Sequence, residues 1–131
     1  MQTFLPLPSF VDSAKVLDYR RLGKQRVECM QLLKALRGGK GWSNHPAAKM
    51  WRGYEEALET YMAACINEWV LRGYKNTMTT KEYNGCKLPP WFGDHDFHAS
   101  HRSNLLRKDR NYYSQFGWFE TSDLPYVWPV L

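Results

Sequence analysis

Residues 19–28, with the sequence YRRLGKQRVE, place four cations and one carboxylate in a segment that otherwise has the composition of a helix. A helix turns by about 100° per residue, so most of these polar side chains fall on one arc, where they could bind a phosphate group. The same arc is typical of a solvated helix face with weak ion pairs between residues four apart. The pattern therefore predicts either an anion-binding site or an exposed face, and its members are Arg20, Arg21, Lys24, Gln25 and Glu28.

Arg26 falls on the opposite arc, among apolar residues. Its long side chain could reach past them to solvent, but a buried guanidinium group needs a partner because its desolvation costs several kcal/mol. We therefore expect Arg26 to be mostly buried and paired with a carboxylate or with backbone carbonyls near a cleft. Gly23 costs a helix about 1 kcal/mol relative to alanine, and its missing side chain lets a backbone or a ligand approach. Both residues favour a site on this helix.

A second polar cluster, DHDFHASHRSNLLRK, spans residues 94–108 and carries three histidines at three-residue intervals. Histidines beside two aspartates could bind a metal ion. However, this spacing places only two of the three imidazoles well on one face, and we expect no metal. The alternative is an anion site at the start of a helix, where free backbone N–H groups favour phosphate. Its candidate ligands are His98, His101, Arg102 and Asn104.

Lys108 belongs to a basic stretch that continues through Arg107 and Arg110 toward Tyr112 and Tyr113. Cations interleaved with aromatic rings suit a nucleic-acid surface, since cations bind phosphates and rings stack on exposed bases. A solvated helix beside a tyrosine-rich core seam would give the same pattern. The composition favours a polyanionic partner, because 18 Lys and Arg against 13 Asp and Glu give a net charge of +5.

The length of 131 residues predicts a single domain, residues 1–131. A hydrophobic fraction of 44% and an aromatic fraction of 15% exclude a disordered chain. Three widely spaced cysteines, an odd number, indicate free thiols in a reducing compartment rather than a disulfide framework or a zinc site. No segment has the roughly 18 consecutive apolar residues of a membrane span, and we expect a soluble cytoplasmic protein.

Three helices must position these side chains. We expect the first to be capped by Asp12 or Ser13, to run to about residue 36 and to stop at Gly38-Gly39. The second and longest should span residues 46–72, and the third should begin near residue 99. The second helix should pack against the first through an apolar stripe of period 3.6, which consists of Met50, Trp51, Tyr54, Leu58, Tyr61 and Cys65.

The segments outside these helices are rich in aromatic residues. Residues 74–97, which contain Asn84-Gly85 and Pro89-Pro90, should form a long loop, and residues 112–131 an extended tail. The sequence therefore predicts an all-α fold with three main helices, long aromatic-rich loops and an extended C-terminal tail.

Three stretches of the chain, in order, resemble the pyrimidine-dimer DNA glycosylase family, typified by phage endonuclease V. LDYRRLGKQRV (17–27) resembles its first helix, residues 47–76 its long central helix, and residues 97–118 its histidine-containing third helix with the aromatic stretch that follows. The motifs D-x-x-R-L-G-K-Q-R-V-E (18–28) and H-x-S-H-R (98–102) are similar to those of a bacterial branch of the family. The resemblance implies an endonuclease V-like fold.

The resemblance also implies a DNA repair glycosylase, with abasic-site lyase activity, that acts on damaged pyrimidines in duplex DNA. In this family the α-amino terminus attacks C1′ of the deoxyribose and forms a Schiff base, for which an amine with a pKa near 8 is a suitable nucleophile. Here Met1 would supply the amine, because Gln2 is too large for removal of the initiator methionine. No cofactor is implied, and we expect a monomer.

A glutamate on the family's first helix stabilises the cationic intermediate, and its position matches Arg21 here. Glu28 lies about two turns, or ~10 Å, further along the helix and is the candidate replacement. The candidate catalytic residues are therefore Met1, Glu28 and Arg21. The side chains expected to hold the DNA around them are Arg20, Lys24, Gln25, Arg26, His98, His101, Arg102, Asn104 and Lys108.

Two other functions fit the same residues. One is nucleic-acid binding without catalysis on the same fold. The other is an enzyme acting on a nucleotide or a small phosphorylated substrate, through His98, His101 and Arg102 with Glu28. Borohydride trapping on abasic-site DNA would separate the repair enzyme from both alternatives.

Overall fold

The computed structural model describes residues 2–38 and 41–129, and every regular element in these two ranges is a helix. This confirms the predicted all-α fold. No described helix is both long and apolar enough to cross a membrane. The elements in chain order are α1 (Phe10–Val16), α2 (Tyr19–Gly38), η1 (Gly41–Asn44), α3 (Pro46–Lys49), α4 (Glu55–Leu71), α5 (His95–Lys108), α6 (Arg110–Tyr113) and η2 (Ser114–Phe116).

The core forms where α2 packs along α4, as the apolar stripe predicted. Gly23 allows a close approach there, since a Cβ atom on it would lie 2.9 Å from the ring of Trp69. The group that approaches Gly23 is therefore a side chain of α4 and not a ligand. Fully buried side chains from both helices meet along this contact, namely Leu22, Cys29, Leu32, Leu58, Tyr61 and Cys65.

The predicted first helix is in fact two helices, α1 and α2. α1 begins earlier than expected because Ser9 caps it, its Oγ accepting a hydrogen bond of 3.1 Å from the N–H of Asp12. The chain is extended at Leu17 (φ −68°, ψ 138°), and the N–H of Asp18 donates to the hydroxyl of Tyr113 at 3.0 Å. The break thus depends on a residue of α6, which no local pattern can show.

The predicted second helix, residues 46–72, is also interrupted. A turn separates α3 from α4, and Gly53 in this turn has a positive φ of 87°. Met50 and Trp51 are nevertheless buried, and Trp51 Nε1 donates to Thr3 Oγ1 at 3.0 Å. The apolar spacing is thus compatible with a turn as well as with a helix.

The third helix and the tail also differ from the prediction. α5 begins at His95 because Asp94 caps it, accepting a hydrogen bond of 3.3 Å from the N–H of Phe97. The chain between α4 and α5 contains no regular element, as predicted. The extended tail begins only after η2, because the first aromatic residues of the predicted tail belong to α6 and η2. The first glycine of the predicted helix stop ends α2, and Gly39 lies outside the described residues.

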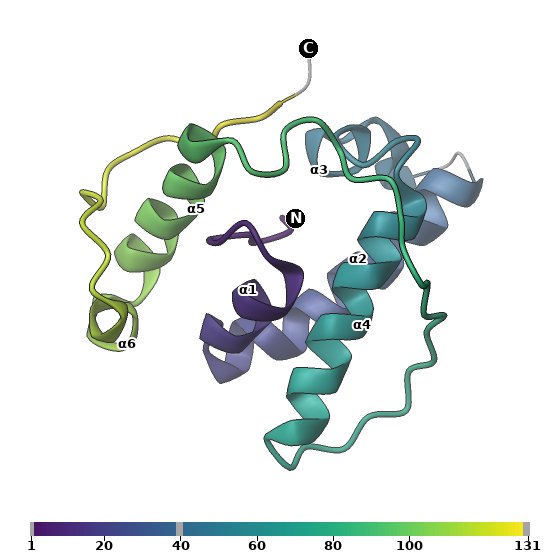
Figure 1. Cartoon of the computed structure of the whole chain (residues 1–131), viewed down its shortest axis with the longest axis horizontal. Helices are drawn as coiled ribbons and strands as arrows, with labels where there is room; N and C mark the ends of the chain where they lie inside the picture. The colour runs from purple at the N-terminus through teal and green to yellow at the C-terminus, as the bar shows by residue number, and fades with distance from the viewer. Residues whose placement is uncertain (1, 39–40, 130–131) are drawn as a thin grey trace.

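The N-terminal segment, residues 2–9, lies in the middle of the molecule, with α5 on one side and α2 and α4 on the other (Figure 1). The chain that joins α4 to α5 runs around the outside, and the C-terminal tail follows α5. The N-terminal segment is therefore the element that joins the two halves of the fold.

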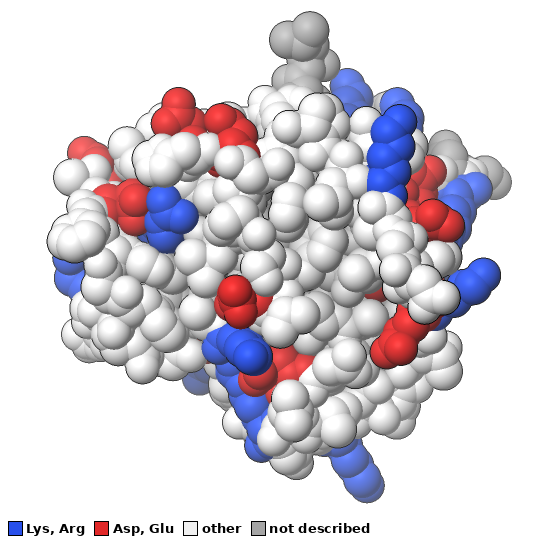
Figure 2. Space-filling model, in the orientation of Figure 1, with Lys and Arg blue, Asp and Glu red and all other residues white. Residues whose placement is uncertain are grey.

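On the face shown in Figure 2, Lys and Arg side chains are scattered beside Asp and Glu rather than gathered in one basic patch.

Replacing Tyr113 with phenylalanine should destabilise the break between α1 and α2. The lost hydroxyl accepts a hydrogen bond from the N–H of Asp18 and donates one to its carboxylate. Burial by itself would raise the pKa of Asp18, but hydrogen bonds from Tyr113 and Arg21 hold this pKa below its ordinary value. The variant therefore leaves a buried carboxylate short of donors, and we expect urea denaturation at pH 7 to show a loss of about 1–3 kcal/mol in unfolding free energy.

Tyr112→Phe is the matched control. The Tyr112 hydroxyl makes a long contact of 3.3 Å to the carbonyl of Leu17 and interacts with the side chain of Arg72, whereas the Tyr113 hydroxyl donates to the buried Asp18 carboxylate. The loss of the Tyr112 hydroxyl should therefore cost less than about 1 kcal/mol. Equal losses in the two variants would contradict the special role of Tyr113.

Candidate functional site

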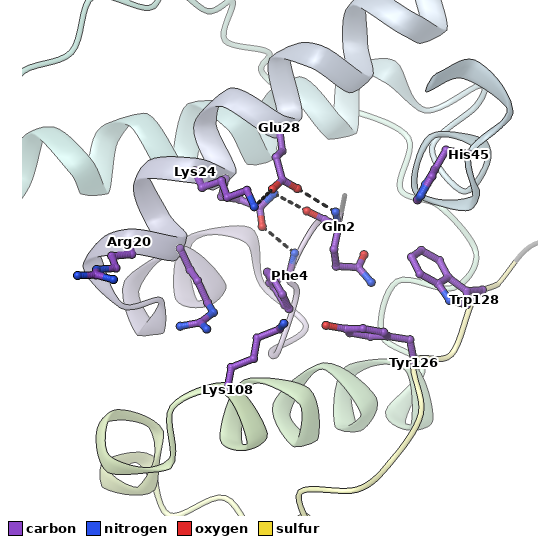
Figure 3. Close-up of a pocket in the computed structure, with 11 residues that line it drawn as sticks. Gln2, Phe4, Arg20, Lys24, Glu28, His45, Lys108, Tyr126 and Trp128 are labelled. Carbon is purple, nitrogen blue, oxygen red and sulfur yellow. Dashed lines mark hydrogen bonds and ion pairs between the residues drawn. The ribbon is translucent and has the colours of Figure 1, made fainter. Parts of the chain in front are cut away.

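A cavity of about 540 Å³ opens between α2, the N-terminal segment, the end of α5 and the C-terminal tail (Figure 3). Its volume lies within the range of about 300–1,000 Å³ that is usual for small-molecule sites. The polar arc of α2 faces this cavity, so the five side chains that the sequence placed on one arc do lie together. The lining residues are Gln2, Phe4, Arg20, Arg21, Lys24, Gln25, Glu28, His45, Lys108, Tyr126 and Trp128.

Two buried side chains of α2 hold the N-terminal segment against the cavity. Glu28 Oε2 accepts a hydrogen bond of 2.8 Å from the N–H of Gln2. Gln25 Oε1 accepts one of 2.8 Å from the N–H of Phe4, and Gln25 Nε2 donates one of 3.0 Å to the carbonyl of Gln2. The backbone of residues 2–4 is therefore fixed beside Glu28, the only carboxylate that lines the cavity in the described part of the chain.

The cavity is basic, because the described residues that line it include four Lys or Arg side chains and one carboxylate. Lys24 Nζ lies 3.5 Å from Glu28 Oε1, but the Lys24 side chain is 75% exposed and remains accessible to another anion. Arg21 forms an ion pair of 3.0 Å with Asp18. Within the described part of the chain Arg20 and Lys108 form no ion pair, so both are open to an anionic ligand.

Aromatic rings form the opposite wall of the cavity and face the polar arc of α2. The rings of Tyr126 and Trp128 come from the tail, with their centroids 5.8 Å apart, and the ring of Phe4 lies 6.4 Å from that of Tyr126. His45 is 6.2 Å from Trp128, and burial lowers the pKa of its imidazole. Aromatic faces beside cations can stack on nucleobases while the cations bind phosphates.

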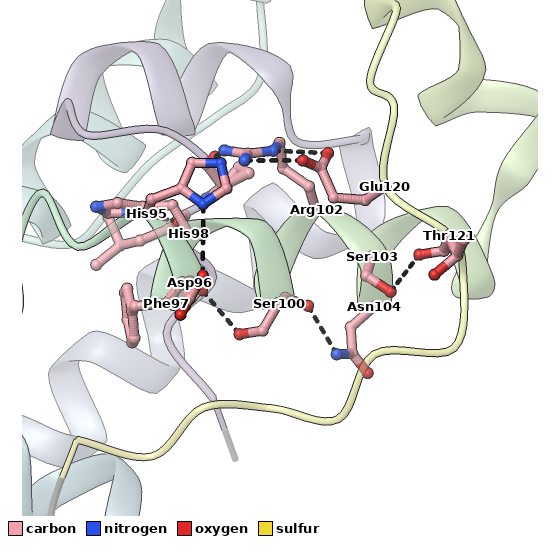
Figure 4. A network of polar contacts seen from close by, with 12 residues as sticks. His95, Asp96, Phe97, His98, Ser100, Arg102, Ser103, Asn104, Glu120 and Thr121 are labelled. Carbon is pink, nitrogen blue, oxygen red and sulfur yellow. Dashed lines mark hydrogen bonds and ion pairs between the residues drawn. The ribbon is translucent and has the colours of Figure 1, made fainter.

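The polar face of α5 holds the tail that carries this wall (Figure 4). Arg102 donates to both oxygens of Glu120, at 2.8 and 3.0 Å, and to the carbonyl of Pro6 at 2.8 Å. Asn104 Nδ2 donates to the carbonyl of Leu124 at 3.0 Å. Arg102 and Asn104 were predicted to bind an anion, but neither lines the cavity, and these contacts make them supports of the tail.

The prediction that His98 and His101 face the same cleft as Lys24 is also wrong. His98 is 2% exposed and His101 is fully buried. His101 Nδ1 accepts a hydrogen bond of 2.9 Å from the N–H of Leu5, and His98 Nδ1 lies 2.7 Å from the carbonyl of Leu5. Because His98 Nε2 accepts from the N–H of Gly93 at 2.9 Å, its Nδ1 is the donor to Leu5.

These two imidazoles are therefore neutral and bind the backbone of Leu5, and they are not ligands of an anion. Helix α5 starts earlier than predicted, so they lie inside it rather than at its start. The described residues contain no cluster of three or more His, Cys, Asp or Glu side chains that could hold a metal ion.

Arg26 is half-buried, but on the side of α2 that faces α4 and away from the cavity. Its guanidinium group lies over the ring of Trp69, 4.2 Å from the centroid, and donates to Asn76 Oδ1 at 2.7 Å. Burial lowers the pKa of Arg26. The prediction that Arg26 pairs with a carboxylate or with backbone carbonyls near the cleft is therefore wrong. Its partners are an aromatic ring and a side-chain amide.

Several lining residues carry no signal in the sequence. Tyr126 and Trp128 belong to a tail whose aromatic density was evident, but no periodicity indicates which rings of an extended chain face inward. Phe4 and His45 lie in short segments without a motif. The candidate catalytic residue Met1 lies outside the described residues.

A family model described as pyrimidine dimer DNA glycosylase matches residues 1–82, which is well over half of the chain. No curated protein and no solved structure matches the chain. The matched part contains the N-terminal segment and the polar arc of α2, whereas Lys108, Tyr126 and Trp128 lie beyond it.

Replacing His101 with asparagine should flatten the pH dependence of stability. Burial lowers the pKa of His101 to about 3, whereas an unfolded histidine titrates near 6.5. The unfolded chain therefore binds more protons at this position as the pH falls below about 6.5, and stability is lost progressively toward pH 3. Burial lowers the pKa of His98 as well, with the same sign.

Asparagine supplies an acceptor for the N–H of Leu5 but does not titrate. We expect His101→Asn to be less stable at pH 7, with a shallower fall in unfolding free energy between pH 7 and 5, measured by urea denaturation. His95→Asn, at a side chain that is 81% exposed, should keep the wild-type slope. An unchanged slope in His101→Asn would contradict the assignment.

Proposed function

The chain belongs to the pyrimidine dimer DNA glycosylase family, and from this membership we propose that it removes damaged pyrimidines from duplex DNA. We further propose that the α-amine of Met1 is the nucleophile and that the same site has abasic-site lyase activity. No cofactor is needed for this chemistry, because the amine itself supplies the attacking lone pair.

The contact between Glu28 and the backbone of Gln2 is the observation that carries the proposal. The nitrogen atom of Gln2, which donates to Glu28 at 2.8 Å, is the atom that the peptide bond joins to Met1. A buried carboxylate therefore lies one residue from the proposed nucleophile. A negative charge at this position can stabilise a cationic intermediate that forms on the amine.

In the proposed reaction the lone pair of the amine forms a bond to C1′ of the deoxyribose. The glycosidic bond breaks, and the damaged base leaves with the bonding electrons and takes up a proton. The attacking nitrogen gives up a proton, and its lone pair then breaks the bond from C1′ to the ring oxygen, which takes up a proton and becomes a hydroxyl. The product is a protonated Schiff base, and loss of a proton from C2′ then expels the 3′ phosphate. Glu28 would stabilise the positive charge of the Schiff base and accept the C2′ proton, as a general base does.

The other lining residues have consistent roles in this proposal. Arg20, Lys24 and Lys108 lie at the rim and would bind phosphates on either side of the lesion. The rings of Tyr126 and Trp128 would stack on a base that has left the helix. Arg21 would act through charge, since its guanidinium group is already paired with Asp18.

One observation favours a second candidate, a DNA-binding protein without catalysis. The position that matches the family's glutamate holds a cation, and the ion pair of Arg21 with Asp18 keeps it in place. No such observation favours an enzyme acting on a small phosphorylated substrate through the histidines. His98 and His101 are buried, and both bind the backbone of Leu5.

Glu28→Gln should keep DNA affinity but lower turnover by about 10²-fold or more, as expected for the loss of an acid–base group. Glutamine still offers an oxygen to the N–H of Gln2, so the fold should be unchanged. The measurements are single-turnover cleavage of a duplex with one thymine dimer and borohydride trapping on an abasic-site duplex. Wild-type protein should give a covalent adduct, and chemical blocking of the α-amine should abolish it.

Two results would contradict this proposal. Wild-type turnover in Glu28→Gln would exclude the carboxylate from the reaction. Tight binding of damaged duplex by the wild-type protein without any adduct or cleavage would favour the non-catalytic DNA-binding protein.

Lys108→Ala should reduce the salt dependence of DNA binding. Each phosphate contact adds about one unit to the slope of log affinity against log salt concentration, so the slope should become shallower by about one. Fluorescence anisotropy with a labelled duplex at several concentrations between about 50 and 300 mM NaCl measures this slope. Lys34→Ala is the control, because Lys34 is exposed on α2 but does not line the cavity, and its slope should equal that of the wild type.

A further inference from the structure

Gln2 has one polar atom without a partner, and this atom is buried. Its backbone N–H donates to Glu28, its carbonyl accepts from Gln25, and its side-chain Oε1 accepts from the N–H of Thr3 at 2.9 Å. Its Nε2 has no hydrogen-bond partner among the described residues, although Gln2 is only 8% exposed. A buried donor without an acceptor is unfavourable, so an acceptor from a ligand would complete it.

The orientation of this amide follows from the hydrogen bonds. Since Oε1 must face the N–H of Thr3, the amide cannot be flipped without losing that bond, and Nε2 points the other way. Figure 3 shows the Gln2 side chain pointing away from Glu28, toward Tyr126 and Trp128. The free donor therefore faces the aromatic wall of the cavity.

The surroundings of this donor indicate which acceptor it would take. Phosphate oxygens would be held by the cations at the rim, where Lys24 is largely exposed. Gln2 instead offers a neutral donor beside aromatic faces, which matches a ring that stacks on them and carries a carbonyl oxygen on its edge. A pyrimidine base has this form, because O2 and, in thymine, O4 are acceptors.

We propose that Gln2 is a base-reading residue, whose Nε2 donates to a carbonyl oxygen of a pyrimidine held beside Tyr126 and Trp128. This inference rests on the proposed function, since it takes the ligand of the cavity to be damaged DNA. Gln2 is thereby a specificity-determining residue that contacts the base, whereas the proposed nucleophile contacts the sugar.

Gln2→Glu tests this directly. Glutamate has the shape of glutamine and can still accept from the N–H of Thr3, but it presents an oxygen where Nε2 stood. Its size also keeps the second residue too large for removal of the initiator methionine. We expect cleavage of the glycosidic bond in a thymine-dimer duplex to fall by 10-fold or more, mainly through a higher KM. Cleavage at a preformed abasic site, which has no base to read, should fall several-fold less than cleavage of the dimer duplex.

Gln2→Met is a second variant, which removes the donor without adding a charge, and it should show the same split with a smaller loss. Equal losses on both substrates would overturn the proposal, because they would mean that Gln2 only supports the fold or the nucleophile. Unchanged activity on the thymine-dimer duplex would overturn it as well. The melting temperature of each variant shows whether it is folded.

Binding separates this inference from the proposed function. The dissociation constants of a thymine-dimer duplex and of a duplex with a tetrahydrofuran abasic analogue are compared for wild type and Gln2→Glu. A wild-type preference for the dimer that the variant loses would support base reading even if the protein cleaved neither duplex, which would overturn the catalytic proposal alone. A wild type without preference, or a variant that keeps it, would overturn base reading.

Discussion

The structure depends on how the backbone of the buried N-terminal segment finds its hydrogen bonds. An extended chain that joins no sheet has unpaired N–H and C=O groups, and burying them without partners is unfavourable. Here side chains from both halves of the fold supply the partners. Gln25 and Glu28 of α2 bind residues 2–4, and His98 and His101 of α5 bind Leu5 on both sides. The two halves are thereby joined through one segment.

This constraint explains why the α5 side chains that were predicted to bind an anion are absent from the cavity. An imidazole that accepts from a backbone N–H cannot also be a cation that binds phosphate, so His101 serves the fold instead of a ligand. Arg102 and Asn104 are likewise occupied by the tail that they hold. These contacts place Tyr126 and Trp128 opposite the polar arc of α2. The part that matches the family therefore supplies the polar arc of α2 together with Phe4 and His45, and the part beyond it supplies Lys108 and the rings of Tyr126 and Trp128.

Glu28 has two roles that follow from one position. It accepts the hydrogen bond of the Gln2 N–H, as any acceptor could. Among the described residues it is also the only carboxylate that lines the cavity, beside four Lys or Arg side chains. A negative charge in such surroundings would be drawn to a cation that forms on a ligand, and Lys24 at 3.5 Å already interacts with it. Arg26, by contrast, serves the contact between α2 and α4 through the ring of Trp69.

The sequence by itself determined the helical class, the contact between α2 and α4 and the polar arc of α2, because each depends on a period of 3.6 residues along one helix. It also indicated that the chain resembles a DNA repair family. Only the tertiary structure decided where the helices break, since the break at Asp18 depends on Tyr113. It likewise decided which polar residues face the cavity. His98 and Arg102 look like ligands in the sequence because their partners, Leu5 and Glu120, are distant segments of an extended chain that no local period describes.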